Sequence, residues 1–176
     1  MSIANLISVA LFGDGGAALL MVGKDHPQAE KAGPSIVATE SAFFADTEHA
    51  MGWAIGDDGF HVVLGSEVPR IAEKLVRPRL ESFLAKHSLS IKDIATWIAH
   101  PGGPKIMTAF EKSFELDPNA LQHSQQSIRE IGNISSASVL DVYCRTVNDL
   151  APAAGSYGVM LALGPGFCAE FVLMQW

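Results

Sequence analysis

The residues with the clearest chemical potential are a histidine and an asparagine, each beside a glycine turn. His100 opens the segment 100–104, His-Pro-Gly-Gly-Pro, and Asn133 lies in the segment 132–138, Gly-Asn-Ile-Ser-Ser-Ala-Ser. An imidazole and a carboxamide can together hold a carbonyl oxygen, which is a device of acyl-transfer chemistry. Because no cysteine or serine lies in a recognisable nucleophile motif, the pair predicts half of an active site.

Each of these residues also has a structural explanation. His100 could satisfy the carbonyl groups of its own loop, and Asn133 could cap the helix that follows it. Ser135 and Ser136 are further candidate caps for that helix, which would leave the Asn133 side chain free to face a substrate. The two segments together are more specific for chemistry than either one alone.

A buried strand and a helix are expected to position the two residues. The near-continuous apolar run 94–99 predicts a central parallel strand that ends at His100. Ligands of open α/β sheets bind beyond the carboxyl ends of such strands. Gly102 and Gly103 would let the backbone come close to a ligand there. Asn133 precedes a helix whose first amide groups carry a partial positive charge.

The remaining patterns predict an α/β protein with layers of helices on a sheet. Further strands are expected at 36–39, 60–64, 157–163 and 167–174, and helices at 68–87 with a break at Pro78, at 104–115, at 118–131 and after Asn133. Residues 6–22 predict a β-hairpin around a glycine-rich turn, and residues 24–35 a polar linker. We therefore expect residues 1–35 to form a hairpin and linker, and residues 36–176 the main domain.

Composition excludes several classes of protein. The 176 residues are 48% hydrophobic and 18% charged, which is typical of a compact chain and hints at a buried partner surface. The formal net charge of −7 argues against nucleic acid as a partner. The uncharged stretch 150–169 is interrupted by glycine and proline, so two buried strands explain it better than a membrane helix. With no signal-peptide pattern, a cytoplasmic location is expected.

The cysteines and the other histidines predict no metal site. Cys144 and Cys168 have neither metal-ligand spacing nor a disulfide framework. Cys144 is expected in the core, on the apolar face of its helix, and Cys168 is expected to be structural. Among the other histidines, His49 and His61 are secondary candidates for a pocket.

Several segments resemble the type III polyketide synthases, the chalcone and stilbene synthase family. The segments 100–106, 132–138 and 163–167 resemble the C-terminal half of those enzymes, and the segment 11–18, Leu-Phe-Gly-Asp-Gly-Gly-Ala-Ala, resembles the end of their N-terminal half. The resemblance covers nearly the whole chain in the family's order. The loop 100–104 distinguishes it from the related ketoacyl synthases III.

The resemblance implies a fold and an activity. The fold would be a thiolase-like half, a layered α-β-α arrangement with a mixed five-stranded sheet, in an enzyme that is a homodimer. Such enzymes load a starter acyl group from acyl-CoA onto a cysteine, decarboxylate malonyl-CoA and condense the two. No cofactor is implied, because the coenzyme A thioesters are substrates.

The resemblance also assigns roles to residues. His100 and Asn133 correspond to the family's catalytic histidine and asparagine, which would stabilise an enolate, and His100 would also hold the cysteine as a thiolate. Lys105 is a local candidate for contacting coenzyme A, and Val62 aligns with the gatekeeping phenylalanine of plant enzymes. The complete set of expected substrate-binding residues is Val62, Gly102, Gly103, Lys105, Ser135, Gly164, Pro165 and Gly166.

The family's nucleophilic cysteine belongs to the N-terminal half, upstream of the point where this chain begins. We therefore expect the chain alone to be inactive and to need that half as a partner. Two alternatives are a ketoacyl synthase III-like enzyme that uses an acyl carrier protein, and a non-catalytic half-domain that serves as a dimerisation or binding module.

Overall fold

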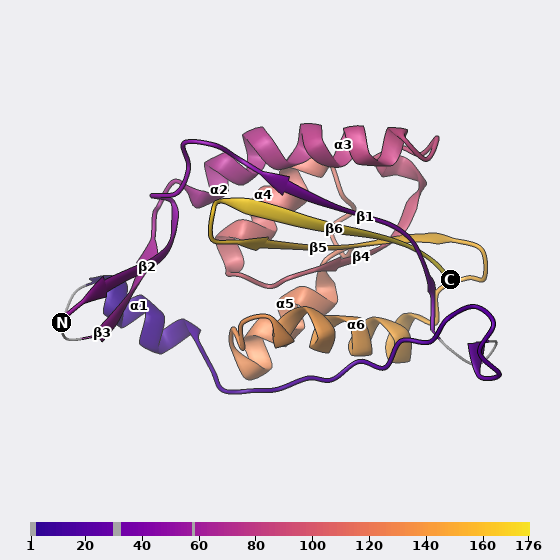
Figure 1. The fold of residues 1–176 in the computed structure, drawn as a ribbon, viewed down its shortest axis with the longest axis horizontal. Helices are drawn as coiled ribbons and strands as arrows, with labels where there is room; N and C mark the ends of the chain where they lie inside the picture. Colours follow the sequence, from indigo (N-terminus) through magenta and orange to yellow (C-terminus); the bar gives the residue numbers. More distant parts are fainter. Residues whose placement is uncertain (1–2, 30–32, 58) are drawn as a thin grey trace.

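A mixed four-stranded sheet forms the centre of the protein in the computed structural model, which describes residues 3–29, 33–57 and 59–176 (Figure 1). The strand order is β1-β6-β5-β4, with β1 at Ser35–Phe43, β4 at Ile94–Ala99, β5 at Tyr157–Gly164 and β6 at Cys168–Gln175. β4 and β5 are parallel, whereas β6 is antiparallel to both β5 and β1. The predicted α/β class and mixed sheet are confirmed.

The fifth strand that we expected in this sheet lies elsewhere. Residues 60–64 belong to β3, Gly59–Leu64, which pairs with β2, Met51–Gly56, as a separate two-stranded sheet. The pairing runs from Met51 opposite Leu64 to Gly56 opposite Gly59, so the backbone of β3 bonds to its neighbour in sequence and not to the central sheet. The sheet of the described chain therefore has four strands and not five.

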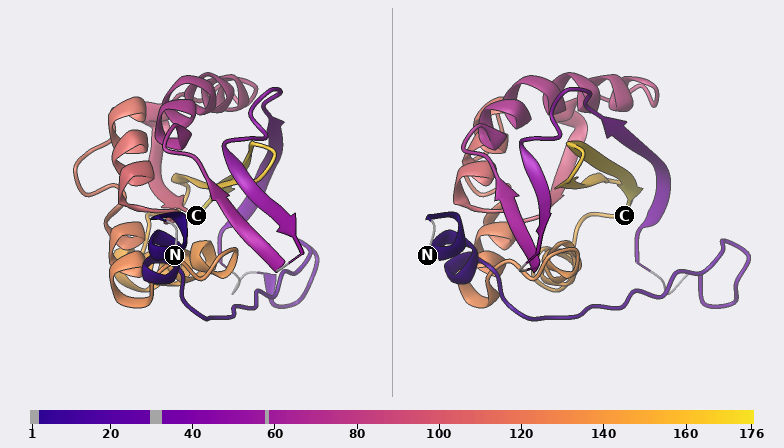
Figure 2. Two further views of the ribbon diagram at one scale, coloured as in Figure 1. Left: turned by 90° about the vertical axis from the view of Figure 1, so that its left-hand side faces the viewer. Right: turned by 60° about the vertical axis from the view of Figure 1, so that its left-hand side comes forward.

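Helices cover both faces of the sheet because its side chains alternate in direction. Val159 and Leu161 of β5 pack in the larger core with α3, Arg77–Ala85, and α4, Pro104–Phe114. Met160, between them in sequence, packs in a smaller cluster with Val142 of α6, Ala137–Leu150. Figures 1 and 2 show α3 and α4 on one side of the sheet, and α6 with α5, Gln122–Ile131, on the other.

The predicted break near Pro78 is present as a change of helix type. α2, Val68–Ile71, continues into a π-helical turn, Ala72–Val76, before α3 begins. Proline has no N–H to donate to the carbonyl group four residues earlier, so a regular α-helical ladder cannot pass through residue 78. The chain changes helix type just before that position.

The hairpin predicted for residues 6–22 is wrong. Residues 3–11 form the helix α1, Ile3–Leu11, and the chain then runs extended past α5 and α6 (Figure 1). A seven-residue apolar run fits a strand or a helix equally well by periodicity. A helix satisfies its backbone groups locally, whereas the hairpin would have needed the segment 17–22 as a paired strand.

Two further expectations need correction. α5 begins at Gln122 and not at Pro118, because the Ala120 N–H donates to the Asp117 carbonyl in a turn that precedes the helix. Cys144 is exposed and not in the core, because α6 buries Val142 and the small polar residues around it instead. Within the described residues, no helix has both the length and the apolar character needed to cross a membrane.

Candidate active site

The loops that carry His100 and Asn133 come to the same edge of the central sheet. β4 and β5 are parallel, so their carboxyl ends share this edge, where the His100 N–H donates to the Leu161 carbonyl over 2.8 Å. A short connection joins α6 to the start of β5, so α6 runs back along the sheet and its first turn lies beside the same edge (Figure 1). The Ser124 hydroxyl of α5 donates to the Ala99 carbonyl over 2.7 Å at the end of β4.

The partly buried imidazole of His100 is uncharged at neutral pH. Burial lowers the pKa of His100 from 6.5 to about 4, because surroundings of low polarity disfavour the charged ring. A neutral ring has one N–H donor and one acceptor nitrogen. It can therefore donate to a carbonyl oxygen or accept a proton from a thiol.

The two glycines after His100 form a tight turn with open space beside it. The Gly102 N–H donates to the His100 carbonyl over 2.8 Å, which closes a turn directly after the strand. A Cβ added at Gly103 would meet nothing within 4 Å. The backbone at Gly103 therefore has free space beside it, as a loop that approaches a ligand requires.

The Asn133 carboxamide is oriented by its own oxygen. This side chain is 5% exposed, and its Oδ1 accepts the Ser135 N–H over 2.9 Å. The Nδ2 group lies at the other end of the carboxamide, away from that bond. The carboxamide thus presents a donor, which is the polarity that a carbonyl oxygen needs.

The expected serine caps do not form. Ser136 precedes α6 without any hydrogen bond from its side chain, and Ser135 is exposed with a left-handed backbone at φ 59°. Instead, Ser138 Oγ accepts the Ile134 N–H over 2.9 Å, and Asn133 itself binds the next free amide. The prediction that Ser135 and Ser136 cap the helix and so leave the Asn133 side chain freer is wrong, because the Asn133 oxygen itself binds the Ser135 amide.

Sequence reasoning missed three residues that hold the Asn133 loop. Leu11 and Gly13 bond to the backbone of Asn133, and the buried Ser138 accepts an amide next to it. The signal at Gly13 is a glycine-rich segment, which by itself favours the turn of a hairpin. The sequence does not identify Ser138 as the partner of the Ile134 amide, because that pairing depends on the course of the backbone.

The segment 164–166 forms the turn between β5 and β6 at the same edge. Gly166 has φ 139°, a backbone conformation that favours glycine, and a Cβ there would lie 3.3 Å from the ring of Phe43. Cys168 Sγ donates to the Pro165 carbonyl over 3.3 Å. Burial raises the pKa of the Cys168 thiol, so at neutral pH it is not the thiolate that a nucleophile requires.

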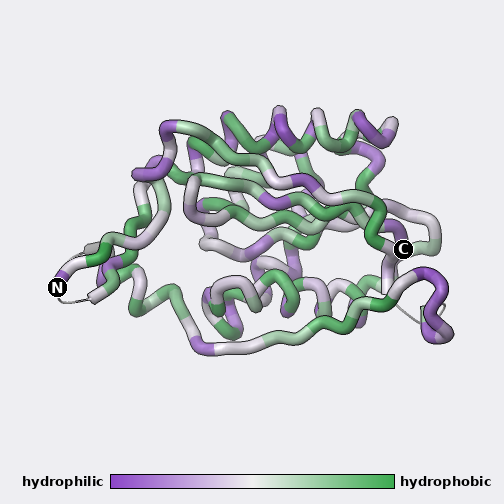
Figure 3. Tube along the Cα trace, in the orientation of Figure 1, coloured by the Kyte–Doolittle hydropathy of each residue, from purple (hydrophilic) through white to green (hydrophobic). Residues whose placement is uncertain are grey.

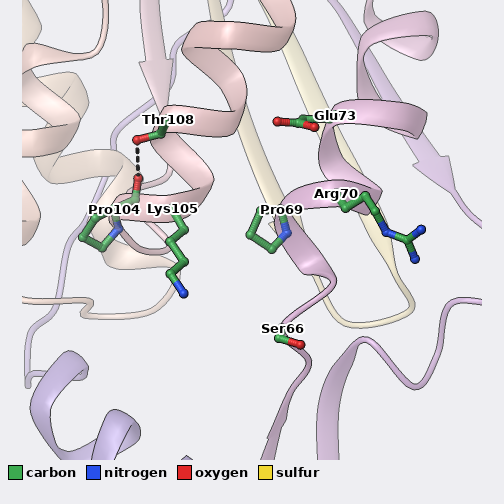
Figure 4. Close-up of a pocket in the computed structure, with 7 residues that line it drawn as sticks. All are labelled: Ser66, Pro69, Arg70, Glu73, Pro104, Lys105 and Thr108. Carbon is green, nitrogen blue, oxygen red and sulfur yellow. Dashed lines mark hydrogen bonds between the residues drawn. The ribbon is translucent and has the colours of Figure 1, made fainter.

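Lys105 lines a cavity beside this edge and not the space at His100. It projects from the first turn of α4 into an open hollow of about 480 Å³, whose other wall carries Arg70 and Glu73 (Figure 4). Its complete lining is Ser66, Pro69, Arg70, Glu73, Pro104, Lys105 and Thr108. The Lys105 ammonium and the Glu73 carboxylate face this space, whereas the Arg70 guanidinium points away from Lys105 (Figure 4).

A second cavity of about 400 Å³ lies between Leu11, α4 and α5, and its lining also includes Gln125 and Arg129. Neither His100 nor Asn133 lines either of these two cavities. In the described residues, no group of three or more histidine, cysteine or acidic side chains is arranged to hold a metal ion.

Val62 and the secondary histidines lie around the hairpin. Val62 is on β3 opposite Trp53, and Figure 1 shows the hairpin at the same end of the molecule as the β5–β6 turn. His61 is its exposed neighbour on β3. His49 is exposed and lies 3.7 Å from Glu67.

Comparison with known proteins identifies the family. A family model described as the C-terminal domain of chalcone and stilbene synthases matches residues 35–176. The chain belongs to the chalcone and stilbene synthase family. The resemblance carried by the segments around His100 and Asn133 is therefore confirmed.

Relatives of this chalcone and stilbene synthase domain are type III polyketide synthases. The 1,3,6,8-tetrahydroxynaphthalene synthase of Streptomyces peucetius subsp. caesius is 46% identical over 175 residues, 99% of this chain and 46% of that protein. A putative chalcone synthase of Bacillus subtilis is 36% identical over 176 residues, 98% of this chain and 48% of that protein. The chain spans about half the length of the curated relatives that it matches.

A solved structure supports the same family assignment. The 1,3,6,8-tetrahydroxynaphthalene synthase of Streptomyces coelicolor, a bacterial type III polyketide synthase, superposes with a TM-score of 0.77 at 32% identity. The match covers 82% of this chain and 41% of that one. The fold is therefore that of a type III polyketide synthase C-terminal portion.

Proposed function

We propose that this chain supplies the histidine and asparagine of a type III polyketide synthase active site, whose cysteine lies on the family's other half. The reaction would condense a starter acyl-CoA with malonyl-CoA. One observation carries the proposal: at the edge of the sheet, the Asn133 side-chain oxygen is occupied by the Ser135 amide, so the group left for a ligand is the Nδ2 donor. That arrangement suits a developing oxyanion and not a cation.

Decarboxylation gives these donors their role. When the bond between the carboxylate and C2 of the malonyl group breaks, CO₂ leaves and the electron pair enters the thioester as an enolate. His100 and Asn133 would donate hydrogen bonds to the enolate oxygen. The enolate carbon would then attack the acyl-cysteine carbonyl, and the cysteine sulfur would leave as a thiolate.

His100 would also accept the proton of the cysteine. In the chain as it stands, burial favours the neutral imidazole and so favours a proton acceptor. A thiolate a few ångströms away would raise the pKa of the ring by stabilising the imidazolium, giving a thiolate–imidazolium pair. The low pKa is thus a property of His100 without its partner.

The cavity beside Lys105 supports a coenzyme A role for that residue. Lys105 reaches into an open hollow next to the His100 loop, and Arg70 lies on the wall of that hollow with its guanidinium directed away from Lys105 (Figure 4). Phosphate groups of a coenzyme A thioester are anions that the Lys105 ammonium would hold. Ser135, Val62 and the 164–166 turn would then border the acyl end.

Complementation tests this function. Incubation of the chain with acetyl-CoA and malonyl-CoA should give neither a product nor an acyl adduct by mass spectrometry. Fusion to the part of the Streptomyces peucetius relative that lies outside the matched region should give malonyl-CoA decarboxylation and polyketide product. In that fusion, His100→Ala and Asn133→Ala should each lower kcat by roughly 10² or more.

Matched controls separate chemistry from folding. The exposed residues His87 and Asn148 carry the same side chains away from the candidate site, and His87→Ala and Asn148→Ala should keep near-normal kcat. A fusion that folds and dimerises but makes no product would favour the non-catalytic module. Turnover or a stable acyl adduct with the chain alone would contradict the proposal.

A further inference from the structure

A short segment near the N-terminus forms hydrogen bonds with both the N–H and the carbonyl group of Asn133. The Asn133 N–H donates to the Leu11 carbonyl over 2.8 Å, and the Gly13 N–H donates to the Asn133 carbonyl over 3.0 Å. The two bonds form a parallel bridge centred on Phe12. Both backbone polar groups of Asn133 are thus satisfied by Leu11–Gly13, which we call the clamp.

The clamp leaves no room for side chains at two glycines. A Cβ at Gly13 would lie 2.6 Å from the Ile131 carbonyl oxygen, closer than such contacts allow. Gly132 has φ 73°, and a Cβ there would lie 3.0 Å from the Leu11 carbonyl oxygen. Any larger residue at Gly13 must therefore push the clamp away from the Asn133 loop.

Inside the loop, three further hydrogen bonds hold the segment that carries the carboxamide. Asn133 Oδ1 is bonded to the Ser135 amide, and the Ile134 amide is bonded to the fully buried Ser138 hydroxyl. The Ser138 N–H in turn donates to the Ser135 carbonyl over 3.0 Å. The loop can present Nδ2 only while the backbone of Asn133 stays where the clamp holds it.

We infer that the clamp, Leu11–Gly13, and Ser138 are positioning residues that set the direction of the Asn133 Nδ2 donor. The clamp precedes residues 35–176, the part that the family model matches, so the site extends beyond that part. The catalytic meaning of this donor rests on the proposed function. The positioning itself can be tested without any substrate.

Nuclear magnetic resonance of the ¹⁵N-labelled 176-residue chain provides the test. In the unmodified chain, the Asn133 and Gly13 backbone amides should exchange with solvent more slowly than those of Gly16 and Gly23. Gly13→Ala should speed exchange of the Asn133 amide by roughly 5- to 30-fold, as expected for a lost buried hydrogen bond, and should shift the Asn133 side-chain NH₂ signals.

Gly16→Ala is the matched control. It makes the same chemical change three residues along the same extended segment, where a Cβ meets nothing within 4 Å. It should leave the Asn133 signals and exchange unchanged. Equal Asn133 signals in both variants, or unprotected Asn133 and Gly13 amides in the unmodified chain, would overturn the inference.

Ser138→Ala covers the case in which Gly13→Ala fails to fold. It removes the acceptor of the Ile134 amide without adding bulk, so the Asn133 NH₂ signals should shift while the chain stays folded. Ser136→Ala changes an exposed serine that caps nothing and should have no effect. Unchanged Asn133 signals in Ser138→Ala would remove Ser138 from the positioning set.

A titration with malonyl-CoA separates this inference from the proposed function. The titration uses the fusion described under the proposed function, because the isolated chain holds only part of the proposed site. If malonyl-CoA leaves the Asn133 NH₂ signals of the unmodified fusion unmoved, the proposed function fails, while the shift caused by Gly13→Ala still supports the clamp. If malonyl-CoA perturbs the unmodified fusion, the perturbation should weaken in its Gly13→Ala variant and persist in its Gly16→Ala variant. An identical perturbation and Kd in all three fusions would overturn the positioning role.

Discussion

At the scale of single residues, the buried imidazole of His100 links the site to the stability of the fold. The folded chain holds this ring neutral, with its pKa lowered from 6.5 to about 4 by burial. Between those two pH values the unfolded chain binds a proton that the folded chain does not. The contribution of the neutral His100 ring to the free energy of unfolding should therefore be fully present above pH 6.5. It should be lost progressively as the pH drops toward 4.

Denaturant unfolding from pH 7 to pH 4 measures this effect. The full difference in pKa corresponds to about 3 kcal/mol, which is the most that His100 can contribute to the loss. His100→Gln should remove that part of the pH dependence, whereas His87→Gln, at an exposed position, should keep it. The same slope in both variants would show that His100 is already charged or solvated in the folded chain.

His100 and Asn133 could be singled out from the sequence because short motifs fix local geometry. A strand pattern that ends at a histidine and a helix pattern that begins after an asparagine place both at element ends. The direction of the Asn133 carboxamide could not be predicted in the same way. It depends on Ser138 and on the clamp, whose partners are set by the path of the chain and not by spacing.

At the scale of elements, α5 carries two buried serines that differ in hydrogen bonding. The Ser124 hydroxyl donates to the Ala99 carbonyl over 2.7 Å and ties α5 to the end of β4. The Ser127 hydroxyl is equally buried but has no hydrogen-bond partner among the described residues. The ring nitrogens of His123 also lack one there, although Nδ1 lies 3.7 Å from the Asp149 carboxylate. A buried polar group without a partner lowers the stability of the fold.

The contrast predicts opposite effects of one substitution. Ser127→Ala should raise the free energy of unfolding by about 1 kcal/mol, because it removes an unsatisfied hydroxyl. Ser124→Ala should lower it by about 1 kcal/mol, because it leaves the Ala99 carbonyl unbonded. Both changes give α5 the same gain in helix propensity, so their difference in urea unfolding isolates the hydrogen bond. Destabilisation by Ser127→Ala would show that its hydroxyl has a partner in solution.

Elements with strong periodicity or flanking signals were predictable, and those that depend on a partner were not. β4, β5 and α4 lie within a residue or two of their predicted bounds, because each is an apolar pattern with a proline or glycine near at least one end. The apolar run of α1 has no flanking signal that distinguishes a helix from a strand. The two-stranded β2–β3 sheet is not predicted in full, because the sequence of β2 has only a weak alternation of apolar and polar residues. Exposed Cys144 shows the same limit for α6, whose buried residues are Ser138, Val142 and Thr146.

At the scale of the whole molecule, hydrophobic residues are not confined to the core. Figure 3 shows them on α1 and on the β2–β3 hairpin as well as on the central strands. On the hairpin, Trp53, Ile55 and Phe60 are 61%, 78% and 70% exposed. Ile55 is paired with Phe60, whose ring meets that of Trp53 edge to face at 6.3 Å, so the three share one face. The high apolar fraction of the sequence is thus explained partly by exposed hydrophobic residues and not only by buried strands.

This hairpin face should make the folded chain bind apolar probes. Contiguous exposed apolar groups are uncommon on monomeric proteins, and a dye such as ANS becomes fluorescent on them. Ile55→Lys together with Phe60→Glu should lower ANS fluorescence while changing the free energy of unfolding by no more than about 0.5 kcal/mol for each exposed substitution. Leu20→Lys, at a site that is 89% exposed and outside the hairpin, is the control and should leave most of the fluorescence. Equal losses in both variants would place the dye elsewhere, and loss of the unfolding transition in the double variant would show that the hairpin face packs in solution.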